Sequence, residues 1–182
     1  KQPSFNDDAP TRNMSWKVDS LNNNLPFGLG GTSRVRTEAQ RNVAWALYVE
    51  LATRMSTQEL KKGQGSAREA LNSVYSLFDT TRGVLRAEGP GAAEGPDSIG
   101  VTAIKILNEG VRPFLVEWHT KLSGFEDAEK LELAKTHGGN HQVPVDEGKW
   151  EDLDGFYVAL NVWRLRMLEY LNGLAAVAGI SA

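Results

Sequence analysis

The sequence predicts an all-α protein, with four long helices in an up-down-up-down bundle after an irregular N-terminal arm. Apolar residues recur at helical spacing over four separate stretches. Two of these stretches open with a capping box, Thr37-Glu-Ala-Gln40 and Ser66-Ala-Arg-Glu69. The connections are short or medium in length. Four amphipathic helices joined in this way bury their apolar faces most simply as an antiparallel bundle.

Composition narrows the class of protein. The chain has 182 residues, of which 41% are hydrophobic and 24% charged, so one domain can bury a core without metal or disulfide. A net charge of -3 offers no global basic field to a nucleic-acid backbone. The absence of cysteine excludes a disulfide framework, a thiol nucleophile and a cysteine metal site, and it fits a reducing cytoplasm.

Neither a membrane span nor a leader is expected from the sequence. No apolar run approaches the roughly 18 to 20 residues that cross a bilayer. The chain starts at Lys1 without a basic-then-apolar leader. We therefore expect it to be part of a longer polypeptide.

Residues 1–36 form the expected arm. They are rich in Asn, Asp, Pro, Ser and Gly, which disfavours a long helix. Met14, Trp16 and Val18 alternate with polar residues as in a short strand. The segment Phe27 to Ser33 has the glycines of a phosphate-binding loop, but no Lys precedes a Ser or Thr at the required spacing, so we interpret it as a plain turn.

The helical domain is expected over residues 37–182, and its first helix runs from Thr37 to about Met55, or with a bend to Lys62. At about 100° per residue, its apolar stripe is formed by Val43, Leu47, Leu51 and Met55. Trp45 and Val49 project away from this stripe. Such a second apolar face predicts that the helix is central among several others or offers a patch to a partner.

The second helix is expected from Ser66 to Gly89 and the third from Asp97 or Ser98 to Gly124. Glycines and prolines between Gly89 and Pro96 predict an irregular surface loop. Pro113 predicts a kink in the third helix, because its ring removes a hydrogen bond and clashes with the preceding turn. The third stripe comprises Leu107, Val111, Phe114, Leu115, Trp118 and Leu122.

Residues 125–136 are expected to form a separate short helix, with acidic residues early and Lys135 late, as the helix dipole favours. A loop should follow to about Gly148. The fourth helix is predicted from Leu153 to Val177 or Gly179. Its wide stripe comprises Leu153, Phe156, Tyr157, Leu160, Trp163, Met167, Leu168, Leu171 and Leu174.

Charged residues within or beside the stripes are the main candidates for a functional site: Glu50, Arg54, Arg82 and Arg164. Buried charges are costly unless partners compensate for lost hydration. One interpretation is a structural salt-bridge network that sets helix register, completed by Asp79, Glu117 or backbone carbonyls. Another is a cavity that binds a small phosphate or carboxylate through arginine. The third is that the stripes are misphased and the charges are solvated.

Metal binding and catalysis have weaker support. His119, His137 and His141 would have to complete a three-histidine zinc site with an open position. However, Gly138-Gly139 disfavours a helix that would pair the last two histidines. No Gly-x-Ser-x-Gly motif is present. We predict no metal, no cofactor and no catalytic residue.

Three segments carry a resemblance to a known family: Ala46-Leu-Tyr-Val-Glu-Leu-Ala-Thr-Arg54, Arg68-Glu-Ala-Leu-Asn-Ser-Val-Tyr-Ser-Leu-Phe78 and Leu107-Asn-Glu-Gly-Val-Arg-Pro-Phe-Leu-Val-Glu-Trp-His119. In these segments the chain resembles an uncharacterised family of bacterial helical proteins. The resemblance implies a bacterial source and a helical bundle. It implies no activity and gives no residue a role.

These observations favour a non-enzymatic interaction, assembly or regulatory module of a larger bacterial system, located in the cytoplasm. It would bind a protein partner or itself, with the arm and the loop at residues 89–96 as contact surfaces. The alternative is a sensor domain that binds a small anionic ligand in the bundle core through Glu50, Arg54, Arg82 and Arg164. A metal-dependent hydrolase is the second alternative.

Overall fold

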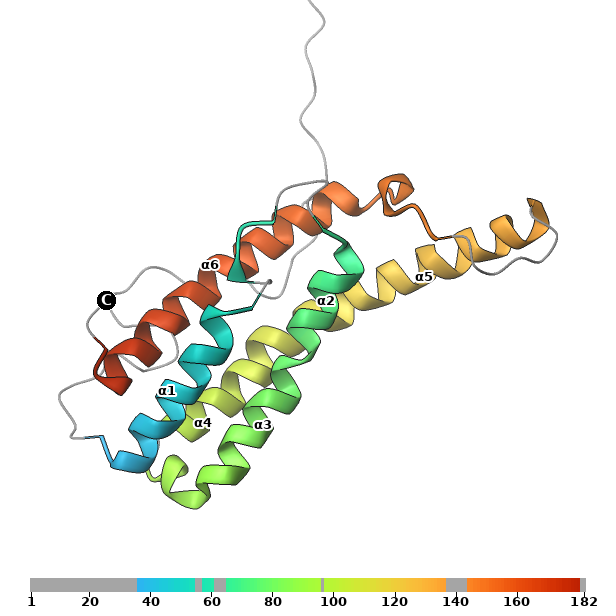
Figure 1. The fold of residues 1–182 in the computed structure, drawn as a ribbon. Helices are drawn as coiled ribbons and strands as arrows, with labels where there is room; N and C mark the ends of the chain where they lie inside the picture. Colours follow the sequence, from blue (N-terminus) through green and yellow to red (C-terminus); the bar gives the residue numbers. More distant parts are fainter. Residues whose placement is uncertain (1–35, 55–56, 61–64, 96, 137–143, 181–182) are drawn as a thin grey trace, which may run out of the picture.

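A computed structural model describes residues 36–54, 57–60, 65–95, 97–136 and 144–180, and in these segments the protein is all-α, as predicted (Figure 1). No strand occurs among them. The predicted arm lies outside the described residues except for Arg36. The strand and turn expected within it lie outside as well.

The first helix, α1 (Glu38–Ala52), begins where its capping box predicts. The Thr37 hydroxyl accepts a hydrogen bond from the Gln40 amide at 3.2 Å, which satisfies one of the free donors of the first turn. Its apolar stripe is buried at Val43, Leu47 and Leu51. The helix ends at Ala52, three residues before the predicted end at Met55.

The prediction of a single helix over residues 66–89 is wrong, because the helix is interrupted at Ser76. It forms α2 (Ala67–Tyr75) and α3 (Leu77–Glu88) instead. The Ser76 hydroxyl donates to the Ser73 carbonyl at 2.8 Å, and such local side-chain bonds compete with the helical ladder. The predicted terminator is confirmed, since Gly89 follows α3 with a positive φ of 79°.

The loop expected over residues 89–96 is partly regular, because it contains a short 3₁₀ turn, η3 (Pro90–Ala93). Helix α4 (Ile99–Lys105) follows and packs against this turn. The contact is close at Gly100, where an added Cβ would lie 2.9 Å from the Ala92 carbonyl oxygen. A residue without a side chain is therefore required at position 100.

The third predicted helix is longer and less regular than expected. After α4 the chain forms a π-helical segment, η4 (Ile106–Val111), and continues as α5 (Arg112–Thr136). The prediction of a separate helix over residues 125–136 is wrong, because α5 continues through Gly124 without interruption. The π-helical segment lies directly before Pro113, which has no amide hydrogen to give to a helical ladder.

The last elements are a 3₁₀ turn, η5 (Glu147–Lys149), and α6 (Leu153–Ala178). The end of α6 agrees with the prediction, since Gly179 caps it in the left-handed conformation. No helix in the described segments is long and apolar enough to cross a membrane.

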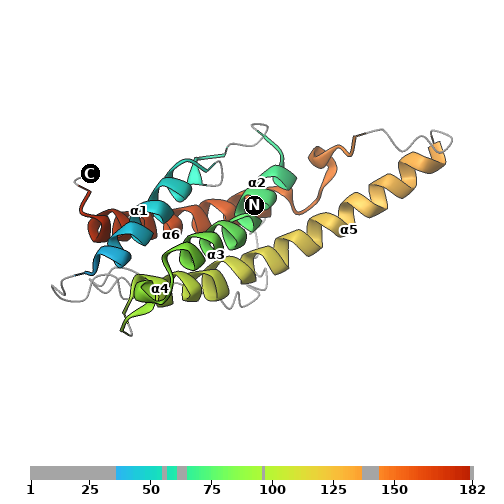
Figure 2. The same cartoon turned by 60° about the horizontal axis from the view of Figure 1, so that its bottom comes forward.

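Helix α1 packs against α6 and α3 and also contacts α4 and η3 (Figures 1 and 2). Helix α2 packs against α5. The C-terminal part of α5 extends beyond the other helices (Figure 2). The buried core is continuous, and its aromatic part joins Phe114 and Trp118 of α5 to Trp150, Phe156 and Trp163.

Glu147 ties η5 to the start of α2. Its carboxylate accepts hydrogen bonds from the amides of Ala67 and Arg68 and from the Ser66 hydroxyl, at 2.6, 3.1 and 2.7 Å. A negative charge at this position also complements the helix dipole. The Arg68 guanidinium in turn binds both carboxylate oxygens of Glu126, at 2.9 and 2.8 Å. These bonds join η5, α2 and α5.

We expect Gly100→Ala to lower the free energy of unfolding by about 1–3 kcal/mol, because the new methyl group meets backbone atoms that cannot rotate away. Denaturant titration followed by circular dichroism measures the change. Gly124→Ala is the matched control, since no atom lies within 4 Å of its added Cβ. It should leave stability unchanged or raise it. Equal stability of the two variants would contradict the close approach of α4 to η3.

Candidate functional site

Arg54 follows α1 and points into the break between α2 and α3. Its side chain is only 14% exposed, and Nη2 lies 3.1 Å from the carboxylate of Glu50, which is 46% exposed. Nη2 also donates to the Thr80 hydroxyl at 2.6 Å, and Nη1 donates to the Ser76 hydroxyl and the Ser73 carbonyl. The guanidinium therefore has acceptors on both sides of the break.

These contacts explain how a guanidinium is accommodated beside the core. Helix ends leave backbone carbonyls without helical partners, and a cation near them is stabilised by hydrogen bonding and by the dipole of the helix. Of the three guanidinium nitrogens of Arg54, Nε is buried without a hydrogen bond to the described residues. The acceptors that the sequence analysis sought for Arg54 are thus two hydroxyls, one carbonyl and Glu50.

Arg82 and Arg164 do not join Glu50 and Arg54, so the predicted single cluster has to be corrected. Arg82 is half exposed and pairs with Asp79 at 3.3 Å. Arg164 donates to the Asn161 amide oxygen at 2.9 and 3.1 Å, one turn earlier in α6. Both side chains bond locally within their own helices. For Arg82 the physical reason is its position in α3, since Thr80 of this helix contacts Arg54 whereas Arg82 lies over Phe78.

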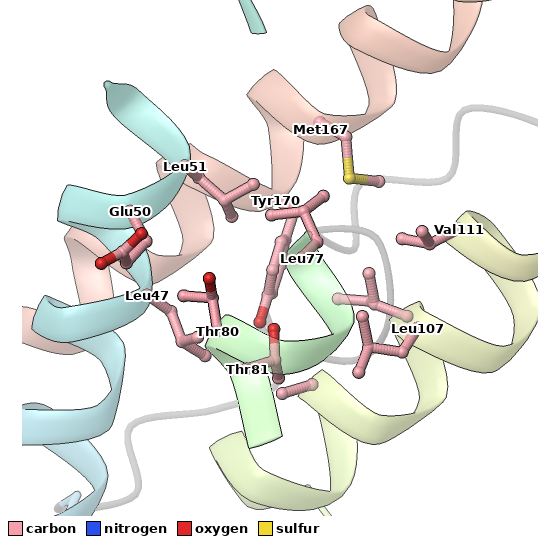
Figure 3. A pocket seen from close by; sticks show the side chains of 12 residues that line it. Leu47, Glu50, Leu51, Leu77, Thr80, Thr81, Leu107, Val111, Met167 and Tyr170 are labelled. Atoms are coloured by element: carbon pink, nitrogen blue, oxygen red, sulfur yellow. The ribbon is translucent and has the colours of Figure 1, made fainter. Parts of the chain in front are cut away.

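A small cavity lies in the core beside Arg54's partners. Its volume is about 20 Å³, and Figure 3 shows residues of α1, α3, η4 and α6 around it. About 10–15 Å³ suffices for one water molecule, whereas ligand pockets measure roughly 300–1,000 Å³. The cavity therefore has room for one water molecule and not for a phosphate ester or a nucleotide. Its walls comprise Leu47, Glu50, Leu51, Leu77, Thr80, Thr81, Ala103, Ile106, Leu107, Val111, Met167 and Tyr170.

Tyr170 is the unusual polar group at this cavity. Its side chain is buried, and its hydroxyl makes no hydrogen bond to the described part of the chain. In Figure 3 the hydroxyl points toward Thr81, while the Glu50 carboxylate lies at the outer edge of the cavity. Burial raises the pKa of the Tyr170 phenol, because the charged form loses its hydration. Tyr170 is therefore a neutral group in an apolar wall.

Of the three histidines, only His119 belongs to the described residues. Its Nε2 lies 3.0 Å from Nη1 of Arg68, and its Nδ1 lies 3.5 Å from the Ser123 hydroxyl. A guanidinium can only donate, so Nε2 is the acceptor in the contact with Arg68. His137 and His141 lie outside the described segments, and within these segments no group of three His, Asp or Glu is arranged to hold a metal ion.

On the surface of α1, Trp45 and Val49 project outward, as the sequence predicts. Their exposed fractions are 53% and 38%. The Trp45 ring stacks on Tyr48 with a centroid distance of 6.0 Å and an interplanar angle of 16°. We call these three residues the Trp45 face. It is an exposed apolar surface of α1, the helix that packs against α6 and α3.

A second surface feature is an open groove of about 380 Å³ along α3 and α5. We call it the Phe78 groove. The sequence analysis missed it, because it is formed by residues of α2, α3 and α5, and residue spacing does not give how these helices are placed relative to one another. Only Arg82 among its members was considered as an anion-binding residue. Its lining comprises Tyr75, Phe78, Arg82, Arg112, Leu115, Val116, His119 and Thr120.

Comparison with known proteins gives no match. No family model, no curated protein and no solved structure is similar to this chain.

Replacing Arg54 and Arg164 in turn shows which of the two arginines stabilises the fold. We expect Arg54→Ala to lower the free energy of unfolding by about 2–3 kcal/mol, because it removes charge-assisted hydrogen bonds at a nearly buried position. Arg164→Ala should cost less than about 0.5 kcal/mol, since its bond to Asn161 is local and exposed. Chemical denaturation of both variants is the measurement. A larger loss for Arg164→Ala than for Arg54→Ala would refute this assignment.

Replacement of Tyr170 tests whether its hydroxyl has a partner. We expect Tyr170→Phe to leave the free energy of unfolding unchanged or to raise it by up to about 1 kcal/mol, because a buried hydroxyl without a hydrogen bond costs stability. Thermal and denaturant unfolding measure the change, with Tyr48→Phe as the control at a surface position. A loss above about 1 kcal/mol would mean that the hydroxyl is hydrogen-bonded in solution.

Proposed function

We propose that this protein is a non-enzymatic helical module that works by protein contact, as an assembly or regulatory part of a larger system. The observation that carries the proposal is the Trp45 face. A tryptophan that is half exposed and held by ring stacking on Tyr48 gives a partner a large apolar surface. Tryptophan and tyrosine are enriched among the residues that dominate binding energy at interfaces.

The position of this face supports the same proposal. Helix α1 uses its opposite side to pack against α6 and α3, so the backbone beneath Trp45 is held by the core. A side chain presented from a rigid helix loses little conformational freedom when it binds. Val49 lies one helical turn from Trp45 on the same outward side, which extends the apolar surface along the helix.

The alternative, a sensor for a small anion in the bundle core, has less support. Its four residues are divided among three separate places, and the cavity next to Glu50 is the size of one water molecule. A phosphate or carboxylate would have to displace core side chains to enter. For a metal-dependent hydrolase, two of the three required histidines lie outside the described segments. This function stays a prediction from the sequence.

The proposal retains the other expectations of the sequence analysis. We infer a bacterial source from the resemblance and a cytoplasmic location from the absence of cysteine. An up-down-up-down order of the long helices and a kink at Pro113 also stay predictions. In this arrangement, the bundle would present the Trp45 face while the arm and the residue 89–96 loop provide additional contacts.

Mutation of Trp45 tests the proposal directly. We expect Trp45→Ala to weaken binding to the partner, or self-association, by at least about tenfold, because an anchoring aromatic side chain contributes about 2 kcal/mol or more. Photo-crosslinking from position 49 in the native host, followed by mass spectrometry, identifies the partner. Sedimentation velocity measures self-association. The loss of stability should be small, since Trp45 already faces solvent.

The control is Leu131→Ala, which removes an apolar side chain that is 59% exposed on the extended part of α5. This variant should bind as the unmodified protein does. A strict monomer that gives no crosslinked protein would contradict the proposed function. Equal weakening by Trp45→Ala and Leu131→Ala would contradict the assignment to the Trp45 face.

A further inference from the structure

The Phe78 groove combines an apolar floor with a cationic rim. Its floor is formed by Phe78 and Leu115, which are 8% and 6% exposed. Tyr75 and Val116 line it with exposed fractions of 59% and 65%, and the Tyr75 and Phe78 rings are 6.3 Å apart. The groove has the volume of a binding site for one large side chain and its neighbours.

Two arginines lie over the ring at the base of this groove. The guanidinium carbons of Arg82 and Arg112 are 5.3 and 5.5 Å from the centroid of Phe78. Both distances allow a cation–π interaction, which orients each guanidinium against the ring. Two like charges held near one ring repel each other, and this repulsion is relieved when an anion binds between or beside them.

The carboxylates of the described chain neutralise this pair only partly. Arg82 has one carboxylate neighbour, Asp79, at 3.3 Å, and the Asp79 side chain is itself 81% exposed. Arg112 donates to the neutral Asn108 amide oxygen at 3.1 Å, and it forms no ion pair within the segments that the structure describes. Exposed ion pairs such as Arg82–Asp79 are weak, so a better placed carboxylate can replace Asp79.

The third basic group of the groove, His119, is fixed by its own contacts. Its Nε2 accepts from Arg68, whose charge is balanced by the two oxygens of Glu126. His119 thus faces Arg68 through Nε2, and Arg82 and Arg112 are the arginines that line the groove. No carboxylate lines the groove.

We propose that the Phe78 groove binds an acidic segment of a partner protein. An aromatic or aliphatic side chain of the segment packs on Phe78 and Leu115 between Tyr75 and Val116. Flanking carboxylates pair with Arg82 and Arg112, where arginine forms two parallel hydrogen bonds to a carboxylate. The inference rests on the proposed function, because it specifies the chemistry of a second contact made by the same interaction module.

Charge complementarity and the apolar lining together favour this occupant. A free phosphate would satisfy the arginines but would leave Tyr75 and Val116 exposed to water. A purely apolar helix would cover these side chains but would desolvate two guanidiniums without a partner, which is unfavourable. A segment that carries both apolar and acidic residues satisfies both parts of the lining.

Fluorescence anisotropy with three labelled synthetic peptides tests the proposal. The first peptide has a central tryptophan–leucine pair flanked by glutamates. The second replaces the glutamates with glutamines, and the third replaces the tryptophan and leucine with serines. We expect saturable binding of the first peptide and at least about tenfold weaker binding of each of the others. The affinity should fall as the salt concentration rises.

Variants of the full chain then assign the binding to the groove. We expect Arg82→Ala and Arg112→Ala each to lower the affinity for the first peptide by about tenfold. Arg86→Ala is the matched control, since this exposed arginine of α3 does not line the groove. It should bind as the unmodified protein does. Circular dichroism confirms that each variant is folded.

Three outcomes of the peptide experiments would overturn the proposal. The first is that the first peptide shows no saturable binding. The second is that the Arg112→Ala variant binds this peptide as tightly as the unmodified protein does. The third is that inorganic phosphate competes with the labelled peptide as strongly as the unlabelled first peptide does. Self-association that is lost in Arg112→Glu would make a second copy the occupant and would also overturn it. If the peptide fails to bind while crosslinking through the Trp45 face succeeds, only the groove inference fails and the proposed function stands.

Discussion

The packing of α1 against α6 and α3 is the contact on which the rest of the bundle depends. It buries Val43, Leu47 and Leu51 in the continuous core, and it brings Arg54 to the break between α2 and α3. The apolar contact supplies most of the stabilisation, since hydrophobic burial is the dominant favourable term in folding. The hydrogen bonds of Arg54 add specificity, because they require α1 and the break to meet in one relative position.

The helices are irregular in two places. The helix is interrupted at Ser76, between α2 and α3, and the π-helical segment η4 precedes α5. A π-helical turn holds more residues than an α-helical turn, so it changes the helical phase that a uniform projection assumes. Arg82 lies over Phe78 because the two residues are four apart in α3, and Arg112 reaches the same ring from α5. Spacing within one helix could not show that Arg112 shares this ring or that Arg82 lies apart from Arg54.

This division between core and surface favours contact over catalysis or sensing. In the part of the chain that the structure describes, a water-sized cavity lies beside Tyr170, and the nearly buried guanidinium of Arg54 is hydrogen-bonded to acceptors of the protein. The features that are available to another molecule lie outside, at the Trp45 face and in the Phe78 groove. Both offer aromatic side chains on rigid helices, and the groove adds two arginines. Interfaces are enriched in these residue types.

The sequence by itself determined the helical class, the capped starts of α1 and α2, the glycines after α3 and α6, and the outward position of Trp45. These features follow from local rules, namely residue spacing, side-chain caps and backbone freedom. Tertiary structure alone decided where Arg82 and Arg164 lie, how α4, η4 and α5 join, and which residues form the Phe78 groove. The reason is that residue spacing gives the faces of one helix but not how that helix is placed and rotated against its neighbours. Only packing between the helices decides this arrangement.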